Sequence, residues 1–383
     1  MSKPSEPVGI YIHIPFCRSI CPFCNFATAP RQQESEADYL RALKREIVGY
    51  RPPGARGRKE TLRVDSIYFG GGTPSVLSSE QIREILEAVH WRFEVAADPE
   101  VSLELDPGTA DRDTLAGYVA VGVNRLSVGG QSFNDKVLKG IGRQHDADEI
   151  RKTFRDARAA GLTNINLDLM VGLPGEIPEN DFEGLDDLRP EHASVYILEL
   201  ARDVPMAKEE SRGHLELPSD ENTLDSYCRA RDGLGSLGLE HYEISNFAQP
   251  GFESRHNLKY WTDRPYLGFG ASAHSYLGGS RFWNVRSHAR YVEKMDDLGS
   301  AVETRDPFNA GRRAAEHLFT GLRRAQGVSL REVKKRYGVS VMETYGEKLK
   351  PYVDLGLLHV TDEVLKLTER GFLVSNEVFE VFL

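Results

Sequence analysis

Hydrophobic positions along the chain follow two alternating patterns. Short runs rich in β-branched and aromatic residues are separated by longer segments in which apolar residues recur every three to four positions. This alternation predicts strands and amphipathic helices in βα units on a parallel sheet. The predicted strands span residues 8–14, 65–69, 101–105, 125–129, 165–171 and 194–198. Six such units fit an open doubly wound α/β sheet or an incomplete α/β barrel, and the pattern does not choose between them.

The first helices have recognisable ends. Ser35, followed three residues later by Asp38, resembles a capping box at the start of the first helix. Ser79 is expected to begin the second helix. Gly161 suits the C-terminal end of a third helix, because glycine readily adopts the positive φ that such ends use.

The character of the sequence changes twice along the chain. Residues 1–240 carry the βα alternation, whereas residues 241–307 are rich in aromatic, glycine and polar residues. From residue 308 two helix-like segments lead to a predicted short hairpin and a further helix. We therefore expect a sheet or barrel domain at 1–240, a connecting region at 241–307 and a smaller, mainly helical domain at 308–383.

Polar and small residues follow the C-terminal ends of the predicted strands. Cys17 follows the first strand, "GGGTP" (70–74) the second, Asp106 the third, Gln131 the fourth and "GLPGE" (172–176) the fifth. In both candidate folds the C-terminal ends of parallel strands carry the functional site. We therefore expect one face of the sheet to hold it.

Composition and charge narrow the possible partners. The formal net charge of −10 argues against a nucleic-acid partner, because phosphate binding needs a concentrated basic surface. The sequence has no stretch near the ~18 apolar residues of a membrane span, and the N-terminus does not look like a signal peptide. We expect a cytoplasmic protein, in which clustered cysteines are more typical of a metal site than of disulfides.

Three of the four cysteines form such a cluster. Cys17, Cys21 and Cys24 follow the spacing C-x3-C-x2-C, and no second cysteine pair completes a zinc site. Iron–sulfur clusters are normally held by four thiolates. A loop with three would leave one iron open to a ligand that carries an amino and a carboxylate group, and S-adenosylmethionine (SAM) is such a ligand.

The cysteine spacing together with "FGGGTPS" (69–75) resembles the radical SAM superfamily. The resemblance implies an incomplete (β/α)6 barrel, a [4Fe-4S] cluster on the three cysteines and SAM beside it. It also implies a set of SAM-contacting residues, of which Tyr11 and Phe23 also shield the cluster. These are Tyr11, Phe23, Gly71, Gly72, Thr73, Glu104, Gln131, Arg143 and Asp168. Core packing for the two aromatic residues, and structural ion pairs or caps for the last four polar residues, are the alternatives.

Within that superfamily, "YIHIPFC", "NRLSVGGQSFN" and "LTERGFLVSNEVF" resemble the oxygen-independent coproporphyrinogen III dehydrogenases and their paralogues. The dehydrogenases have a longer N-terminal arm and a fourth cysteine at the position that Phe26 occupies here. Both departures favour a haem-chaperone subgroup of the family, which carries the motif H-N-x-x-Y-W.

The chain contains that motif as "HNLKYW", with His256, Asn257, Tyr260 and Trp261. An imidazole can ligate haem iron, and aromatic rings can pack on a porphyrin. The alternatives are a structural role for His256 and haem ligation by His274 or His241 instead.

The resemblance therefore implies a haem chaperone that binds a [4Fe-4S] cluster, SAM and haem and transfers haem to an acceptor haem protein. Delivery to a membrane-associated acceptor stays open. The alternative is an enzyme that decarboxylates coproporphyrinogen III oxidatively to protoporphyrinogen IX. A third reading, RNA modification, is disfavoured by the acidic charge.

Overall fold

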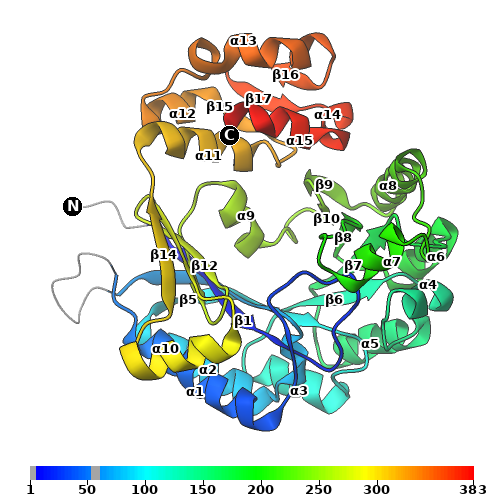
Figure 1. Cartoon of the computed structure of the whole chain (residues 1–383), viewed down its shortest axis with the longest axis vertical. Coiled ribbons are helices and arrows are strands. Elements are labelled where there is room, and N and C mark those ends of the chain that lie inside the picture. Colours follow the sequence, from blue (N-terminus) through cyan, green and yellow to red (C-terminus); the bar gives the residue numbers. More distant parts are fainter. Residues whose placement is uncertain (1–5, 53–60) are drawn as a thin grey trace.

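A computed structural model describes residues 6–52 and 61–383. Among these residues, twelve strands form one curved sheet with the order β14-β13-β12-β11-β1-β4-β5-β6-β7-β8-β10-β9 (Figure 1). Its centre consists of six parallel strands in chain order. They are β1 (Val8–Ile14), β4 (Arg63–Gly71), β5 (Glu94–Leu105), β6 (Arg125–Gln131), β7 (Ile165–Val171) and β8 (His192–Ile197). The six predicted strands and the incomplete barrel are confirmed.

Helices cover the outer, convex side of these strands (Figure 1). Ile10 and Ile12 of β1 are fully buried in the same core as Tyr39 and Leu43 of the first helix, so the predicted apolar stripe does face the sheet. The helices are α1 (Gln33–Gly49), α2 (Ser79–Arg92), α3 (Arg112–Ala120), α4 (Asp135–Gly140), α5 (Ala147–Ala159), α6 (Pro178–Leu188) and α8 (Asp220–Ser236).

One of the two predicted helix starts is wrong and the other is confirmed. Helix α1 begins at Gln33, and the Ser35 hydroxyl donates to the Gln32 carbonyl instead of capping the helix. Helix α2 begins at Ser79 as predicted, and the preceding residue, Ser78, caps it in a capping box with Gln81. The end of α5 is confirmed, since Gly161 follows the helix with φ of +97°.

Residues 241–307 extend both edges of the sheet. Strand β11 (Tyr266–Phe269) lies parallel to β1, and β12 (His274–Leu277), β13 (Ser280–Asn284) and β14 (Val302–Pro307) continue outward in antiparallel pairs. At the other edge, β9 (Glu240–Glu243) and β10 (Asn246–Ala248) pair beside β8. The segment also contains α9 (Arg255–Trp261) and α10 (His288–Leu298). The expected boundaries at 240 and 308 stay predictions.

The C-terminal part has a core of its own, around Leu318, Val333, Leu349 and Phe379. Its predicted hairpin and following helix are present, and a three-stranded sheet with the order β15-β17-β16 supports the helices. The elements are α11 (Ala310–Gly321), β15 (Val328–Ser329), α12 (Leu330–Tyr337), α13 (Val341–Asp354), β16 (Leu358–Val360), β17 (Val364–Leu367), α14 (Glu369–Leu373), α15 (Ser375–Phe379) and a 3-10 turn at Glu380–Phe382. The smaller, mainly helical domain is confirmed.

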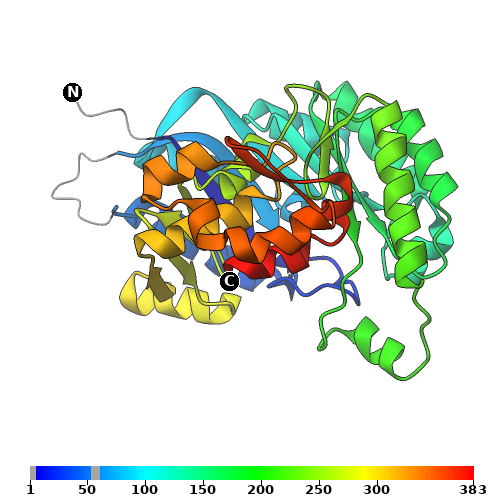
Figure 2. The ribbon, with the colours of Figure 1, turned by 90° about the horizontal axis from the view of Figure 1, so that it is seen from above.

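Two further features position the site. The short strands β2 (Phe16–Cys17) and β3 (Ala29–Pro30) pair in parallel, and a 3-10 turn at Pro74–Val76 follows β4. Between β8 and α8 the chain makes a long excursion that contains α7 (Pro205–Ser211), seen at the lower right of Figure 2. Met206 of α7 is buried against Met170 of β7. Within the described residues, no helix is both long enough and apolar enough to cross a membrane.

Candidate functional site

The three clustered cysteines lie on one loop, residues 17–29, which we call the cluster loop. It leaves the sheet after β1 and returns beside its own start, because β2 and β3 pair in parallel. The Ala29 amide donates to the Pro15 carbonyl over 2.8 Å, and the Arg31 amide donates to the Cys17 carbonyl over 2.9 Å. The two ends of the loop are thus fixed to each other at the C-terminal edge of the sheet.

All three thiols of the loop are free, with Cys17 buried and Cys21 and Cys24 half-buried. Burial is the main cause that raises the pKa of Cys17 to about 11; a hydrogen bond with Thr73 opposes this shift, and the neighbouring thiols contribute to it. Burial also raises the pKa of Cys24. Thiolates so placed repel one another, so the loop needs a cationic centre to hold them deprotonated.

The donor set fits an iron–sulfur cluster better than a single metal ion. Within the described ranges, no three His, Cys, Asp or Glu side chains are placed to share one ion. A multinuclear cluster gives each thiolate its own iron, and three free thiols on one loop match that requirement.

Two glycines let the end of β4 lie directly against the cluster loop. A Cβ atom on Gly71, whose φ is +121°, would lie 2.6 Å from the His13 ring. A Cβ atom on Gly72 would lie 2.7 Å from the Pro15 carbonyl oxygen and 2.9 Å from Sγ of Cys17. The Thr73 amide donates to the Phe16 carbonyl over 2.9 Å. A side chain at Gly72 would therefore displace the first cysteine, and a side chain at Gly71 would displace the His13 ring.

Glu104 of β5 is the carboxylate nearest to this glycine turn. Its Oε2 accepts from the Gly71 amide over 3.0 Å, and its Oε1 accepts from the Tyr68 hydroxyl over 3.0 Å. Burial is the main cause that raises the pKa of Glu104 to about 7; the negative charge of Asp168 acts in the same direction, and the Gly71 hydrogen bond opposes it. Both of these hydrogen-bond partners are groups of the protein itself, as expected if Glu104 has a purely structural role, so that alternative to SAM binding remains.

Asp168 and Gln131 continue the row of polar groups across the sheet. Asp168 of β7 accepts from Asn166 over 2.8 Å and from Ser127 over 3.1 Å, and burial raises its pKa. Gln131 ends β6 with φ of +68°, and its buried Oε1 has no hydrogen-bond partner among the residues described. A buried carbonyl oxygen in that condition calls for a donor from a ligand or water, which fits the predicted SAM site.

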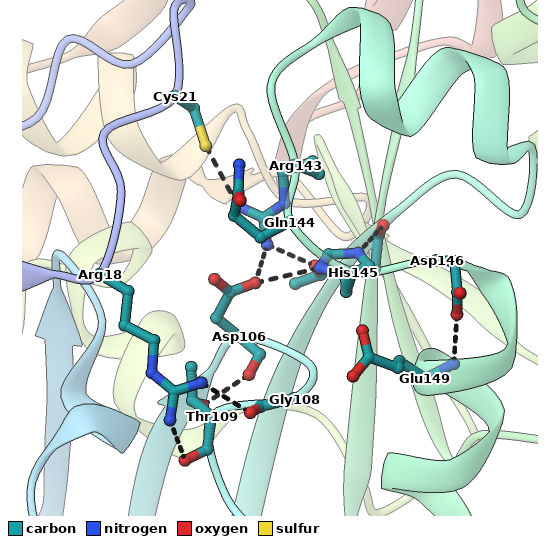
Figure 3. Close-up of polar contacts among 12 residues, drawn as sticks. Arg18, Cys21, Asp106, Gly108, Thr109, Arg143, Gln144, His145, Asp146 and Glu149 are labelled. Carbon is teal, nitrogen blue, oxygen red and sulfur yellow. Dashed lines mark hydrogen bonds and ion pairs between the residues drawn. The ribbon is translucent and has the colours of Figure 1, made fainter.

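Arg143, on the turn between α4 and α5, reaches the cluster loop (Figure 3). Its Nη1 donates to Sγ of Cys21 over 3.4 Å, and its Nη2 donates to the Gly129 carbonyl over 2.9 Å and pairs with Asp106. From the loop itself, Arg18 donates to the carbonyl of Gly108 over 2.8 Å. These contacts tie the loop to the ends of β5 and β6.

The two predicted aromatic residues lie in different surroundings. Tyr11 of β1 stacks on Tyr68 with ring centroids 6.2 Å apart, and its hydroxyl lies 3.1 Å from Nδ1 of His13. Phe23 packs instead against a small apolar cluster that includes Met170 and, from α7, Met206. Shielding of a metal cluster by Phe23 stays a prediction, while its core packing is observed.

The histidine of the "HNLKYW" motif points into the protein. His256 is fully buried, its Nδ1 lies 3.1 Å from the Ser66 hydroxyl and its Nε2 lies 2.9 Å from the Tyr260 hydroxyl. Its ring also stacks on Tyr68, with centroids 5.3 Å apart. Burial, followed by the charge of Lys259, lowers the pKa of His256 to about 3. In this conformation His256 anchors α9 on the sheet, and both of its nitrogens are already engaged.

The other three residues of the motif lie in three different surroundings. Asn257, half-buried, lies in the first turn of α9, where its amide donates to the Ser254 hydroxyl over 3.2 Å. Trp261 lies under the guanidinium of Arg323, 5.4 Å from its ring centroid, at the junction with the C-terminal part. Tyr260 lines a cavity that the other three residues of the motif do not line. The motif therefore does not form one compact site.

That cavity, of about 440 Å³, joins the motif to the cluster loop. Tyr260, Tyr266 and Phe26 supply aromatic rings, and His274 and Arg286 supply an imidazole and a guanidinium. Its other lining residues are Tyr11, His13, Asn25, Ala27 and Ser272. The sequence reasoning missed Tyr266 and Arg286 because nothing in their local pattern marks them.

The two rival histidines lie in different cavities. His274 is exposed and stacks on Trp283 with ring centroids 5.4 Å apart. His241 packs between the rings of Phe247 and Phe372, beside a second cavity of about 460 Å³ at the junction of β9 with the C-terminal part. Of the two, only His274 shares a cavity with the motif and the cluster loop.

Comparison with known proteins agrees with these features. The family models that match are the Radical SAM superfamily, over residues 11–188, and the HemN C-terminal domain, over residues 312–374. The chain is 36% identical to the heme chaperone HemW of Bacillus subtilis (strain 168), over 97% of this chain and 98% of that protein. It is 32% identical to the heme chaperone HemW of Escherichia coli (strain K12), over 98% of each.

A solved structure supports the same relationship. The coproporphyrinogen III oxidase HemN of Escherichia coli, described as a radical SAM enzyme, matches with a TM-score of 0.86 and 27% identity, over 99% of this chain and 91% of that one. The relatives named HemW are matched at higher identity and over nearly their whole length. The chain belongs to the HemW family within the radical SAM superfamily.

Proposed function

We propose that this protein is a haem chaperone, which binds haem beside a [4Fe-4S] cluster and SAM and passes the haem to an acceptor haem protein. The observation that carries the proposal is its full-length similarity to proteins named heme chaperone HemW. The exposed Phe26, at the position where the dehydrogenases are expected to have a cysteine, supports it. The cytoplasmic location expected from the sequence stays a prediction.

Cys17, Cys21 and Cys24 would hold the cluster. When bound, the cluster supplies an iron with open coordination positions and an electron for reductive chemistry. Around it, Gln131 offers an unpartnered carbonyl oxygen to the amino end of SAM, and Arg143 offers a guanidinium to its carboxylate. Of the other predicted partners, Gly71, Gly72, Thr73 and Glu104 lie at or just after the ends of β4 and β5, whereas Tyr11 and Asp168 lie in the middle of β1 and β7.

The haem site that we propose is the cavity beside the cluster loop. Aromatic rings of Phe26, Tyr260 and Tyr266 suit the porphyrin faces, and Arg286 suits a propionate carboxylate. His274 is the imidazole that lines this cavity and is exposed. His256 supports the site indirectly, because its hydrogen bond holds the Tyr260 hydroxyl in place.

A haem titration followed at the Soret band tests this proposal. We expect saturable binding by the wild-type chain and at least tenfold weaker binding by His274→Ala. The control is His90→Ala, which removes an exposed histidine from the outer helix α2 and should bind as the wild type does. Absence of saturable binding would contradict the chaperone proposal, and equal binding by all three would contradict the assignment of His274.

Oxidation of coproporphyrinogen III is a second candidate function, favoured by the structural match to HemN. Anaerobic incubation of the reconstituted protein with coproporphyrinogen III, SAM and a reductant distinguishes the two. Accumulation of a protoporphyrin product would support the second function, and its absence alongside saturable haem binding would support the first.

A further inference from the structure

Gln131 lies at the centre of a strained turn at the end of β6. Its φ is +68°, and the Ser132 amide donates to the Gly130 carbonyl over 2.9 Å. A hydrogen bond that spans a single residue with positive φ is typical of the rare γ-turn, which is strained for a residue with a side chain. The pairing of β6 with β7 also shifts register between Gly129 and Gln131, and such a bulge re-aims the side chain that follows it. Strain of this kind persists only where the surrounding structure holds it.

The side chain of Gln131 lies in the proposed SAM site, beside Arg143. A Cβ atom on Gly129 would lie 3.2 Å from Nε2 of Gln131 and 3.3 Å from Nη2 of Arg143, so the amide and the guanidinium lie against the same glycine. The buried Oε1 of Gln131 has no hydrogen-bond partner among the described residues. Because no partner fixes this oxygen, its direction depends on the backbone of the turn.

Asp181 of α6 holds the two residues that follow Gln131. Its Oδ1 accepts from the Phe133 amide over 2.6 Å and from the Ser132 hydroxyl over 3.0 Å. Gly184 lets α6 lie this close, because a Cβ atom there would lie 2.4 Å from the Phe133 ring. One carboxylate oxygen therefore fixes both residues, and the turn cannot relax without breaking these hydrogen bonds.

No ion pair within the described part of the chain offsets the burial of Asp181. Burial is the main cause that raises the pKa of Asp181 to about 6, and its hydrogen bonds with Phe133 and Ser132 oppose the rise. Burying a carboxylate without a cationic partner costs free energy. What this carboxylate contributes in return is the attachment of the turn to α6.

We propose that Asp181 is a positioning residue for Gln131. By holding Ser132 and Phe133, it keeps Gln131 in the γ-turn and so keeps the amide oxygen of Gln131 available to a ligand. The amino group of SAM is a donor of the kind that this oxygen lacks. The inference rests on the proposed binding of SAM.

Equilibrium dialysis of radiolabelled SAM against the anaerobically reconstituted protein tests it. Asp181→Ala should weaken SAM binding about fivefold, the contribution of one hydrogen bond. Its iron content should not change, because both hydrogen bonds of Asp181 go to residues that follow β6. Asp181→Asn keeps an acceptor oxygen in the same place and should bind SAM nearly as the wild type does. The control is Glu183→Ala, which removes an exposed carboxylate from the same helix and should not change SAM binding.

A double variant separates positioning from a merely structural role. If Asp181 acts through Gln131, Gln131→Ala/Asp181→Ala should bind SAM no more weakly than Gln131→Ala does. Wild-type affinity or loss of iron in Asp181→Ala would overturn the proposal, and so would additive losses in the double variant. Should Asp181→Ala fail to fold, Ser132→Ala removes one of the two donors instead, and undiminished SAM affinity in that variant would overturn the proposal. Absence of SAM binding by the wild-type chain would refute the proposed SAM site itself, a failure distinct from that of Asp181.

Discussion

Replacing Gly71 by alanine tests whether the end of β4 sets the place of the cluster loop. The new methyl group would meet the ring of His13 at 2.6 Å. That ring cannot move freely, because its Nε2 donates to the Ala27 carbonyl over 2.9 Å and its Nδ1 lies within hydrogen-bond distance of Tyr11. Ala27 belongs to the cluster loop, so relief of the clash displaces the loop.

A matched glycine separates the clash from backbone strain. Gly161 also has a positive φ, +97° against +121° for Gly71, but no described heavy atom lies within 4 Å of the position of its Cβ. Alanine at either position should lower the free energy of unfolding by about 1–3 kcal/mol through φ alone. At Gly71 the overpacking adds about 1–3 kcal/mol more.

Urea unfolding of the apo protein and iron content after reconstitution measure the two effects. We expect Gly161→Ala to lose stability but to bind iron and absorb near ~400 nm as the wild type does. Gly71→Ala should lose more stability and most of its iron. Equal stability and equal iron content in the two variants would refute the argument that His13 transmits the clash to the cluster loop.

Three further predictions concern the cysteines, a buried carboxylate and α7. Alanine at any cysteine of the cluster loop should abolish the absorption near ~400 nm, whereas Cys228→Ala should keep it; unchanged iron would refute the ligand set. Burial raises the pKa of Glu46 from 4.5 to about 7. The stability that the protonated Glu46 side chain contributes, about 3 kcal/mol, is therefore complete below pH 4.5 and is lost as the pH rises through 7. The urea midpoint of the wild type should fall between pH 5 and 8, and Glu46→Gln should remove this fall. An unchanged fall in the variant would show that another group causes it. Met206→Ala should speed the loss of iron to a chelator, whereas Met206→Leu should not; equal rates would show that α7 does not support the loop.

The strands could be predicted from the sequence because the centre of the sheet is buried on both faces. Strands β1 and β7 have the predicted bounds, and all but one residue of each is buried, so their apolar runs are continuous and unmistakable. The capping residues were harder to predict than the strands, because Ser78 and Ser79 have the same side chain and either could cap α2. The backbone geometry, and not the residue type, decided that Ser78 closes the capping box.

The site was predictable in part for the same reason. Parallel strands bring their C-terminal ends to one edge, so the order of motifs along the chain already indicated that Cys17, Gly71, Glu104 and Gln131 lie near one another. The pairing of Asp106 with Arg143 was not visible in the sequence. It depends on the turn after α4, which places the guanidinium on the Asp106 carboxylate.

By itself, the sequence determined the family, the parallel strands and the three thiols, since these depend on local spacing and on burial patterns. Only the tertiary structure decided what the "HNLKYW" segment does. Packing of α9 on β4 turns His256 onto Ser66, where its side chain is fully buried. The insertion of β11 beside β1 brings Tyr266 and His274 to the cluster loop, from more than 230 residues away. Contacts over such separations follow from the strand order of the sheet, which no local pattern of residues records.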